Sequence, residues 1–221
     1  MTDERVAAGL REQLASWRAE LQGGARRVGW KIGLNVPEVQ QALGIGEPVI
    51  GYLTSATLLE PGGSFDGTGA ERLMAEPEVA LTIGHDVEPG DLDDAREAIA
   101  AFAPAIELVD VGGSSGDVQA ILAGNVFHRA VVFGEERPAL VDVSLDGTIA
   151  ARGEVRESAE VPRDYADVVE LTARLLAGAG ERLEEGDRII AGSLTPQVPV
   201  EPGDEVSVDL GPLGGVAVRI A

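Results

Sequence analysis

The amino-acid sequence predicts an α+β fold built on a bent, mixed or antiparallel β-sheet with flanking helices. Strand-like segments outnumber helical ones along the 221 residues. They do not alternate strictly with helices, as the strands of a doubly wound parallel sheet do. No low-complexity or Pro/Ser-rich stretch divides the chain. We therefore expect a single domain over residues 1–221, to which residues 1–25 contribute an N-terminal helix.

Five segments have the pattern of α-helices. In the first, apolar side chains recur at helical spacing from Val6 to Leu21. In the second, Asn35 is a candidate N-cap, and Pro37 lies in the first turn, where a missing N–H costs nothing. The predicted helices span residues 6–22, 35–44, 91–102, 117–124 and 164–179, and Gly180 ends the last of them.

Apolar runs and alternating patterns predict the strands. Asp146-Gly147 is a hairpin-turn signal, and a second turn is expected near Gly211-Pro212. The glycine-rich stretch at residues 61–69 reads as a loop, because it lacks the spacing of a phosphate-binding loop and a following helix. The predicted strands lie within residues 26–34, 49–59, 73–83, 105–111, 125–134, 139–155, 188–200 and 205–220.

The composition argues against several classes of partner. The formal net charge of −21 makes nucleic acid and anionic membranes poor partners, because phosphate binding needs clustered Lys and Arg. There is no apolar run of about 18 residues and no secretion signal at the N-terminus. Without cysteine, the chain has no disulfide, thiolate nucleophile or sulfur metal site. We expect a cytoplasmic protein that binds neither nucleic acid nor membrane.

Three glutamates occur inside strand-like runs. Glu76 and Glu78 are two residues apart, so on a strand both side chains point to the same face. Glu107 lies within the apolar run AIELV. Alternatively, the first two occupy the solvent face of an edge strand and Glu107 pairs with an arginine. Burying an unpaired carboxylate is energetically costly. The simplest partner is a divalent cation, Mg²⁺ or Mn²⁺, that keeps coordination positions for water or substrate.

Lys31 is the only lysine among 17 Lys and Arg residues. A chain that otherwise uses arginine has kept an ammonium here, or one lysine has survived by chance. An ammonium is a compact point charge, whereas a guanidinium is bulky and always protonated. Alternation in the strand places Lys31 on the face opposite Trp30 and Ile32. We therefore interpret Lys31 as a candidate functional residue.

Five segments together resemble a known family. They are, in order, GWKIGLNVPEVQQALGIGEPVIGYL, AEPEVALTIG, PAIELVD, LAGNVFHRAVVFG and AGSLTPQVPVEPGDEVSVDLGPLGGVAV. This order resembles the 2-keto-4-pentenoate hydratase and 4-oxalocrotonate decarboxylase branch of the fumarylacetoacetate hydrolase superfamily. The resemblance runs from about residue 26 to the C-terminus and implies a mixed β-sandwich or roll.

The resemblance implies a metal site and a class of substrate. Mg²⁺ or Mn²⁺ would be held by Glu76, Glu78 and Glu107, and the substrates would be small 2-oxo acids or their enols. The metal would stabilise a developing enolate as a Lewis acid. Lys31, in the K-I-G motif, would pair with the developing oxyanion or the carboxylate. The resemblance also suggests a homo-oligomer.

The resemblance further implies substrate contacts from a second set of residues. Ser193 matches a hydroxyl-bearing residue that contacts substrate, and its neighbours Gly192 and Leu194 are assigned to the same group. Asn125 is the one residue retained from an Asp-Asn-Ala-Ser-Ser run that hydratases of this branch often carry. The loss of the other polar groups weakens the case for hydration.

The two histidines have different predicted roles. His128 is a candidate general base in place of the lost polar groups, since imidazole titrates near neutrality. Alternatively, it is an exposed or buried strand residue without a catalytic role. His85 follows a glycine in a turn and is expected at the surface. Asp110 and Asp117 are expected at a strand end and a helix cap, not as metal ligands.

The sequence thus predicts a divalent-metal-dependent lyase, a hydratase or a decarboxylase, that acts on a small 2-oxo acid or 2-hydroxydienoate. In this hypothesis Lys31 completes the charge at the metal, and His128 or water delivers the proton. One alternative is an acylpyruvate-type carbon–carbon hydrolase or keto-enol isomerase with the same three glutamates. However, such hydrolases use a histidine that precedes the strand with the metal ligands. The first histidine of this chain, His85, follows that strand. The other alternative is a non-catalytic partner subunit.

Overall fold

Two β-sheets form the centre of the protein in the computed structural model, which describes residues 3–113, 116–138, 146–162 and 164–221. The larger sheet has the strand order β2-β1-β10-β5-β6-β7-β3, and β11 pairs with β5. The second sheet has the order β4-β13-β12-β8-β9. Parallel pairs such as β1 with β10 occur beside antiparallel pairs such as β5 with β6. The predicted α+β class with mixed sheets is confirmed.

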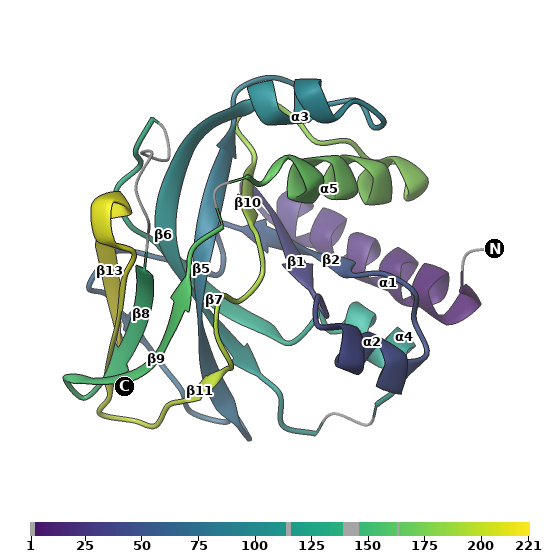
Figure 1. The fold of residues 1–221 in the computed structure, drawn as a ribbon. Coiled ribbons are helices and arrows are strands. Elements are labelled where there is room, and N and C mark those ends of the chain that lie inside the picture. Colours follow the sequence, from purple (N-terminus) through teal and green to yellow (C-terminus); the bar gives the residue numbers. More distant parts are fainter. Residues whose placement is uncertain (1–2, 114–115, 139–145, 163) are drawn as a thin grey trace.

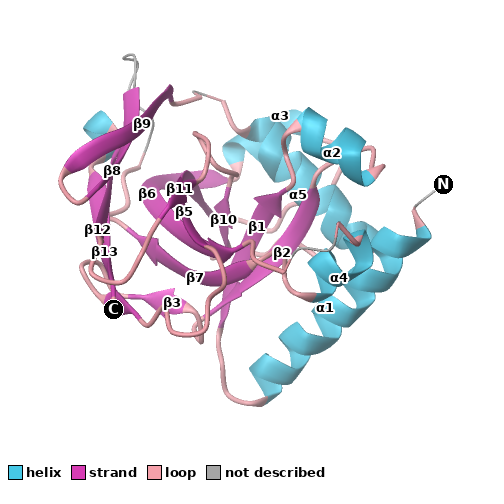
Figure 2. Ribbon diagram, turned by 90° about the horizontal axis from the view of Figure 1, so that it is seen from below, coloured by secondary structure: helices cyan, strands magenta, loops and turns pink. Residues whose placement is uncertain are grey.

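The larger sheet is strongly curved and carries the helices on one side (Figures 1 and 2). Figure 1 shows α1 and α5 to the right of β5 and β6, and β8 and β13 of the second sheet to the left of β5. The strands of the larger sheet are β1 (Arg27–Gly33), β2 (Val49–Thr54), β3 (Leu58–Leu59), β5 (Leu73–Ile83), β6 (Ile99–Asp110), β7 (His128–Phe133), β10 (Arg188–Ile190) and β11 (Val198–Pro199). Those of the second sheet are β4 (Ser64–Phe65), β8 (Asp146–Ala151), β9 (Glu154–Glu160), β12 (Glu205–Asp209) and β13 (Gly215–Ile220).

The helices match the predicted segments, with differences at their ends. The Asp3 side chain caps α1 by accepting from the Arg5 N–H. Val36, not Asn35, occupies the N-cap of α2, while Pro37 begins the helix as predicted. The helices are α1 (Glu4–Gln22), α2 (Pro37–Leu43), α3 (Leu92–Glu97), α4 (Val118–Ala123) and α5 (Ala166–Gly178), with a 3₁₀ turn at Gly211–Leu213. No described helix has the length and apolar character that a membrane crossing requires.

The helix predicted over residues 91–102 is too long. It ends at Glu97, and β6 begins at Ile99. β6 pairs with β5 along its whole length, from Ile83 opposite Ile99 to Leu73 opposite Asp110. This long-range pairing outweighs the local helical pattern.

The hairpin turn predicted at Asp146-Gly147 is wrong, because these residues begin β8. The chain turns instead at Arg152 and Gly153, whose φ angles of 55° and 73° suit a tight two-residue turn. Gly147 allows close packing, since a Cβ there would lie 2.9 Å from Leu210 Cδ2. The earlier part of that predicted strand, residues 139–145, lies outside the described residues.

One hydrophobic cluster connects the two sheets and the helices. It includes Trp17 of α1, Trp30 of β1, Ile106 of β6 and Val218 of β13, all buried. The two tryptophan rings are 5.1 Å apart between centroids. This shared core supports the single-domain prediction, which stays an interpretation. β5 and β6 lie side by side at the centre of the larger sheet, where the side chains of Glu78 and Glu107 are buried.

Candidate metal centre and substrate pocket

The antiparallel pairing of β5 with β6 brings the three predicted glutamates together. Glu76 lies directly opposite Glu107, and Glu78 lies opposite Ala105, two residues along. One carboxylate oxygen from each glutamate lies within 4.8 Å of the others. Glu78 and Glu107 are only 1% and 0% exposed. Like charges placed directly across a ladder are unfavourable, so this arrangement needs a positive partner.

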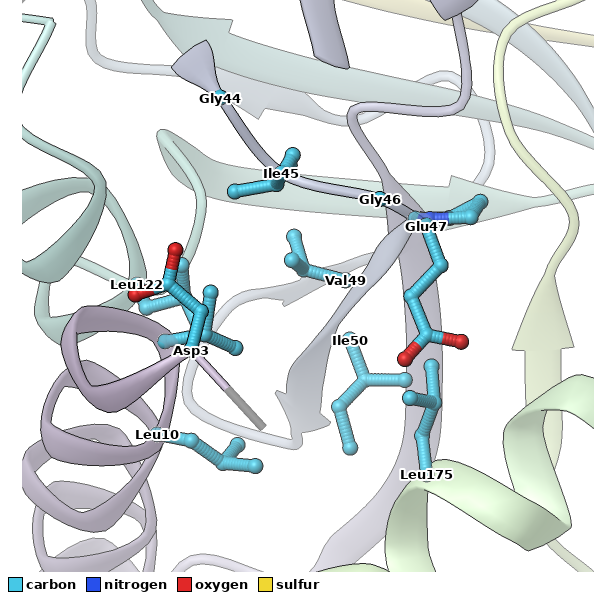
Figure 3. Close-up of a pocket in the computed structure, with 12 residues that line it drawn as sticks. Asp3, Leu10, Gly44, Ile45, Gly46, Glu47, Val49, Ile50, Leu122 and Leu175 are labelled. Atoms are coloured by element: carbon cyan, nitrogen blue, oxygen red, sulfur yellow. The ribbon is translucent and has the colours of Figure 1, made fainter. Parts of the chain in front are cut away.

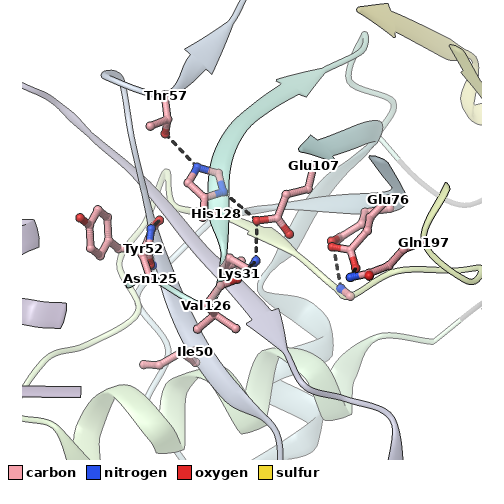
Figure 4. A network of polar contacts seen from close by, with 12 residues as sticks. Lys31, Ile50, Tyr52, Thr57, Glu76, Glu107, Asn125, Val126, His128 and Gln197 are labelled. Atoms are coloured by element: carbon pink, nitrogen blue, oxygen red, sulfur yellow. Dashed lines mark hydrogen bonds and ion pairs between the residues drawn. The ribbon is translucent and has the colours of Figure 1, made fainter. Parts of the chain in front are cut away.

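Glu107 is held by two side chains that converge on the same oxygen (Figure 4). Lys31 Nζ donates to Glu107 Oε1 at 2.5 Å. His128 Nδ1 lies 2.7 Å from that same Oε1. The other ring nitrogen of His128, Nε2, lies 2.9 Å from Thr57 Oγ1. Both nitrogens of the imidazole are therefore used inside the protein.

The other two carboxylates also use one oxygen for a protein donor. The backbone N–H of Gly192 donates to Glu78 Oε2 at 2.7 Å. Gln197 Nε2 donates to Glu76 Oε1 at 2.8 Å. Gly192 has φ +99°, and a Cβ there would lie 2.4 Å from Asn35 Nδ2, so this contact requires glycine. The chain that follows β10 thus supplies one donor to Glu78 and one to Glu76.

The remaining oxygens fit a divalent cation. Glu78 Oε1 and Glu107 Oε2 are buried without a hydrogen-bond partner among the described residues. A buried carboxylate oxygen without a partner is costly. Three closely spaced carboxylates are the hard oxygen ligands that Mg²⁺ and Mn²⁺ prefer, and they leave positions for water or substrate. Glu76, Glu78 and Glu107 therefore fit the metal role that the resemblance implies.

The protonation of the cluster without metal follows from burial and mutual repulsion. Burial, followed by the charge of Glu107, raises the pKa of Glu76 from 4.5 to about 7. Burial and the charges of Glu107 and Glu76 raise the pKa of Glu78 well above its usual value. Burial opposes ionisation of Glu107 as well, but Lys31 and His128 outweigh it, so its pKa is lowered. A bound cation favours the charged form of all three.

Lys31 is positioned for a further contact in the pocket. It is 2% exposed, and it also donates to the Val126 carbonyl at 3.1 Å. Gly51 makes room for it, because a Cβ there would lie 2.7 Å from Lys31 Cγ. An ammonium has three N–H donors. Contacts with Glu107 and Val126 use two of them, which leaves the third for a ligand.

A left-handed turn carries the carbonyl that Lys31 contacts. Asn125, Val126 and Phe127 have φ angles of 55°, 52° and 67°. This region is unfavourable for side chains other than glycine, above all for a β-branched valine. The Asn125 side chain holds the turn, since its Oδ1 accepts from Tyr52 N at 2.8 Å and its Nδ2 donates to Tyr52 O at 2.9 Å. Asn125 therefore stabilises the turn and does not extend its amide into the pocket.

A pocket of about 570 Å³ opens beside the cluster. Its polar lining includes Lys31, Glu76, Ser193, Thr195 and Gln197. Its apolar lining comes from β1, α2, α4, the end of β6 and the left-handed turn, and includes Leu34, Val36, Val39, Leu43, Val109, Val111, Ile121, Val126 and Phe127. A concave apolar site with a few converging polar groups is the usual form of a small-ligand site.

The structure separates the predicted site residues into two groups. Lys31, Glu76 and Ser193 line the pocket directly. Glu78, Glu107 and Gly192 lie behind them within the cluster, whereas His128, Asn125 and Leu194 are not among the lining residues. The Leu194 N–H donates to the Pro77 carbonyl at 2.9 Å and its side chain packs against the core. Ser193 Oγ donates to the Thr195 carbonyl at 2.8 Å.

Gln197, Thr57 and Arg72 were not predicted. Gln197 follows the quoted S-L-T-P motif, and a polar residue there could have been noted. Arg72 precedes Glu76 by four residues but lies outside the quoted motifs, and the contact of Thr57 with His128 joins segments 71 residues apart, which the sequence does not show.

The predicted positions of three other polar residues, His85, Asp110 and Asp117, are confirmed. His85 is at the surface, where its Nε2 lies 2.9 Å from Asp94 Oδ1. Asp117 caps α4 by accepting from Gln119 N. Asp110 ends β6 and accepts from the backbone N–H groups of Arg72 and Gly112 at 2.9 and 3.1 Å.

A second pocket of about 500 Å³ lies between α1, α5 and the connection from α2 to β2 (Figure 3). Its acidic lining residues are paired: Asp3 contacts Arg5 at 2.6 Å and Glu47 contacts Arg174 at 2.9 Å. Its other lining is largely apolar. The second pocket thus differs from the glutamate cluster, in which buried carboxylate oxygens have no hydrogen-bond partner among the described residues.

Comparisons with known proteins agree with this geometry. The family described as fumarylacetoacetate (FAA) hydrolase C-terminal matches residues 29–221. A 4-oxalocrotonate decarboxylase of a Pseudomonas species is 30% identical over 221 residues, covering 96% of this chain and 85% of the relative. The 2-keto-4-pentenoate hydratase 1 of Dechloromonas aromatica strain RCB is 30% identical over 248 residues, covering 99% and 92%.

The solved structures give the same family. The 4-oxalocrotonate decarboxylase from Pseudomonas putida G7, complexed with magnesium and adipate, has a TM-score of 0.85 at 27% identity, covering 95% of this chain and 83% of that one. With the match to the family and the two relatives, this shows that the chain belongs to the fumarylacetoacetate hydrolase family, in the branch of the 2-keto-4-pentenoate hydratases and 4-oxalocrotonate decarboxylases.

Proposed function

We propose that this protein is a divalent-metal-dependent lyase that acts on a small 2-oxo acid. The observation that carries the proposal is the cluster of Glu76, Glu78 and Glu107 next to Lys31 at the base of an apolar pocket. When bound, Mg²⁺ or Mn²⁺ would supply Lewis-acid polarisation of the substrate's 2-oxo group. The relatives at 30% identity, a decarboxylase and a hydratase, support the same reaction class.

In this proposal Lys31 stabilises the negative charge that develops on the substrate oxygen during the reaction. Accordingly, the third N–H donor of the ammonium would bind an anionic oxygen of the substrate, while Glu107 and the Val126 carbonyl hold the ammonium in position. In the buried setting this charge pairing is stronger than in water. Lys31 therefore stabilises an enolate-like oxygen and does not need to transfer a proton.

His128 has a positioning role in this proposal. Its ring lies behind Glu107 and uses both nitrogens, one toward Glu107 and one toward Thr57. It orients the carboxylate for the metal, as residues behind metal ligands commonly do. This role replaces proton delivery at the far carbon, which the sequence suggested, because His128 does not line the pocket.

The apolar lining favours decarboxylation over hydration. Phe127 lines the pocket at a position where hydratases of this branch often carry a serine, and Val126 lines it where they carry an alanine. Adding water to a diene needs a group that positions and activates the water. Loss of CO₂ needs a place for the electron pair that remains, and in this proposal the pair moves toward the 2-oxygen, whose negative charge Lys31 would stabilise.

The deciding experiment is a product assay with purified protein and Mg²⁺ or Mn²⁺. 4-Oxalocrotonate and 2-keto-4-pentenoate are supplied separately, and CO₂ release and loss of the diene absorbance are followed. We expect CO₂ release from the first substrate that stops with EDTA and returns with metal. Metal-dependent loss of the diene from the second substrate alone would make the protein a hydratase. Binding of metal without turnover of either would favour the partner-subunit alternative.

Two further expectations accompany this proposal. A cytoplasmic location agrees with a chain that contains no cysteine. A homo-oligomer is suggested by the family, and light scattering on the purified protein measures its mass.

A further inference from the structure

The left-handed turn at residues 125–127 is a strained segment beside the glutamate cluster. Among the described residues, five other than glycine have a positive φ angle, and three of them are consecutive here. Strain of this kind persists only where surrounding contacts impose it, and it concentrates at functional sites. The contacts that impose this turn therefore bear on what the turn does.

The Asn125 side chain takes the place of a neighbouring strand at the edge of β2. β2 lies at one end of the strand order, whereas the turn leads into β7 near the other end. The amide accepts from Tyr52 N at 2.8 Å and donates to Tyr52 O at 2.9 Å, as a paired strand residue would. Figure 4 shows Asn125 beside Tyr52. The buried amide thus fixes the turn against the sheet.

The turn in its fixed position presents the Val126 carbonyl to Lys31. Lys31 Nζ donates to this oxygen at 3.1 Å and to Glu107 Oε1 at 2.5 Å. A single acceptor would leave the ammonium free to swing about that contact. Two acceptors from different elements fix its direction, and with it the direction of the third N–H donor.

Two glycines allow the three side chains to pack closely. A Cβ at Gly51 would lie 2.7 Å from Lys31 Cγ and 2.8 Å from Asn125 Oδ1. A Cβ at Gly33 would lie 2.6 Å from Val126 Cγ1. The lysine stem and the asparagine amide therefore meet over the same piece of bare backbone, so a change at Asn125 is felt at Lys31.

We infer that Asn125 is a positioning residue for Lys31. Through the Val126 carbonyl, it sets the direction in which the ammonium presents its third N–H to an anionic oxygen of the substrate. The inference rests on the proposed function, because that oxygen belongs to a substrate bound at the metal centre. Asparagine suits the role, since it tolerates the left-handed region better than most residues and its amide both donates and accepts.

The first test is Asn125→Gly, because glycine adopts a positive φ without strain and the substitution removes only the amide. Calorimetry measures the affinity for Mg²⁺ and the affinity of the Mg²⁺-loaded protein for oxalate. We expect Mg²⁺ affinity within about twofold of wild type, since the amide bonds Tyr52 and none of the three glutamates. Oxalate affinity should fall about tenfold, as the loss of one well-placed hydrogen bond to a charged group gives.

The second readout is the ammonium itself. Lys31 is the only lysine in the chain, so labelling with ¹⁵N-lysine gives a single side-chain ammonium signal in an NMR spectrum. In Mg²⁺-loaded wild type this signal should shift when oxalate is added. In Asn125→Gly it should differ from the wild-type position before oxalate is added and should shift less afterwards. A signal identical to wild type would overturn the inference.

Gln13→Ala is the matched control. Gln13 is 0% exposed, and its amide donates to the Ile50 and Leu122 carbonyls at 3.1 and 3.0 Å. It therefore also connects β2 with α4, but it does not bond residues 125–127. Gln13→Ala should lower the thermal midpoint while oxalate affinity and the Lys31 signal stay at their wild-type values. An equal loss of oxalate affinity in this variant would overturn the inference.

Lys31→Met separates an effect through Lys31 from a direct contact of Asn125 with the ligand. In this background Asn125→Gly should no longer weaken oxalate binding, and the same tenfold loss would overturn the inference. If Lys31→Met does not fold, the ammonium signal of the Asn125→Gly variant decides. If wild type binds Mg²⁺ but not oxalate, the proposed function fails, whereas an unchanged ammonium signal in Asn125→Gly defeats the inference alone.

Discussion

Two buried carboxylate sites lie three residues apart on β6, at Glu107 and Asp110, and they are satisfied in opposite ways. Asp110 is 7% exposed and accepts four hydrogen bonds from protein donors. Glu107 is 0% exposed, and its Oε2 has no partner among the described residues. Glu107 also lies opposite another glutamate, whereas Asp110 lies opposite Leu73.

The difference separates a buried carboxylate that stabilises the fold from one that is available to bind a ligand. A carboxylate that is fully hydrogen-bonded by the protein stabilises the fold and has no capacity for a ligand. A cluster that leaves buried oxygens without partners is stable only when something else binds them, and such groups concentrate at functional sites. Within four residues, β6 therefore provides both a fixed strand end at Asp110 and a metal ligand at Glu107.

The largest expected effect comes from Glu107→Gln. The substitution removes a charge from the metal centre, so Mg²⁺ affinity should be lost and turnover should fall on the order of a thousandfold, since metal polarisation contributes several kcal/mol at about 1.4 kcal/mol per tenfold. Calorimetry and the product assay measure the two effects. Glu78→Gln, which keeps the Lys31–Glu107 pair, should give the same loss and controls for misfolding. If both variants still bind Mg²⁺, these glutamates do not form a metal centre, and the contrast between Glu107 and Asp110 does not hold.

Asp110→Ala should have the complementary effect. Three backbone N–H groups and Arg129 would lose their acceptor, which should lower the free energy of unfolding by about 1–3 kcal/mol. Metal affinity should stay at the wild-type value, because Asp110 contacts none of the three glutamates. Denaturant unfolding and Mg²⁺ calorimetry test both parts. Loss of metal binding in a folded Asp110→Ala protein would show that the two sites are not separate.

The metal-free protein should lose stability as pH rises through the range of Glu76. Its pKa is raised from 4.5 to about 7 in the folded state, so folding favours the protonated form. The associated stability is present below pH 4.5 and is lost as pH approaches 7. The thermal midpoint should fall by several degrees over this range in EDTA and should be restored by Mg²⁺. The same fall in Glu76→Gln would assign it to another group.

The smallest expected effect is that of Thr57→Val. It removes the hydrogen bond to His128 Nε2 while keeping a similar side-chain volume. Losing one such bond costs about 0.5–1.5 kcal/mol, which corresponds to about a two- to tenfold weaker metal affinity if His128 orients Glu107. Thr82→Val, at a hydroxyl that donates to Glu136 away from the cluster, is the matched control. An unchanged affinity in Thr57→Val would limit the role of His128 to packing.

The sequence predicted those parts of the molecule that depend on local pattern. Strand β5 has the predicted bounds, Leu73–Ile83. The spacing of Glu76 and Glu78 placed them on one face, and the solitary Lys31 proved to be buried against Glu107. These features follow from alternation and from residue choice, which are visible in a single sequence.

Other features depend on pairing between distant segments. The pattern of residues 99–102 is compatible with a helix, and only the ladder with β5 makes them part of a strand. The left-handed turn at Asn125 is held by the backbone of Tyr52, which the sequence does not place beside it. For the same reason, the sequence does not show that the Asn125 amide binds Tyr52 or that the His128 ring lies between Glu107 and Thr57.

The central claim is that the three glutamates bind a divalent cation that in turn binds a 2-oxo acid. The most direct measurement is titration calorimetry of metal-stripped wild-type protein with Mg²⁺ and with Mn²⁺, each with and without oxalate as an enolate mimic. We expect saturable metal binding that becomes tighter with oxalate, because oxalate adds oxygen ligands and contacts Lys31. No binding of either metal, with or without oxalate, would contradict the account.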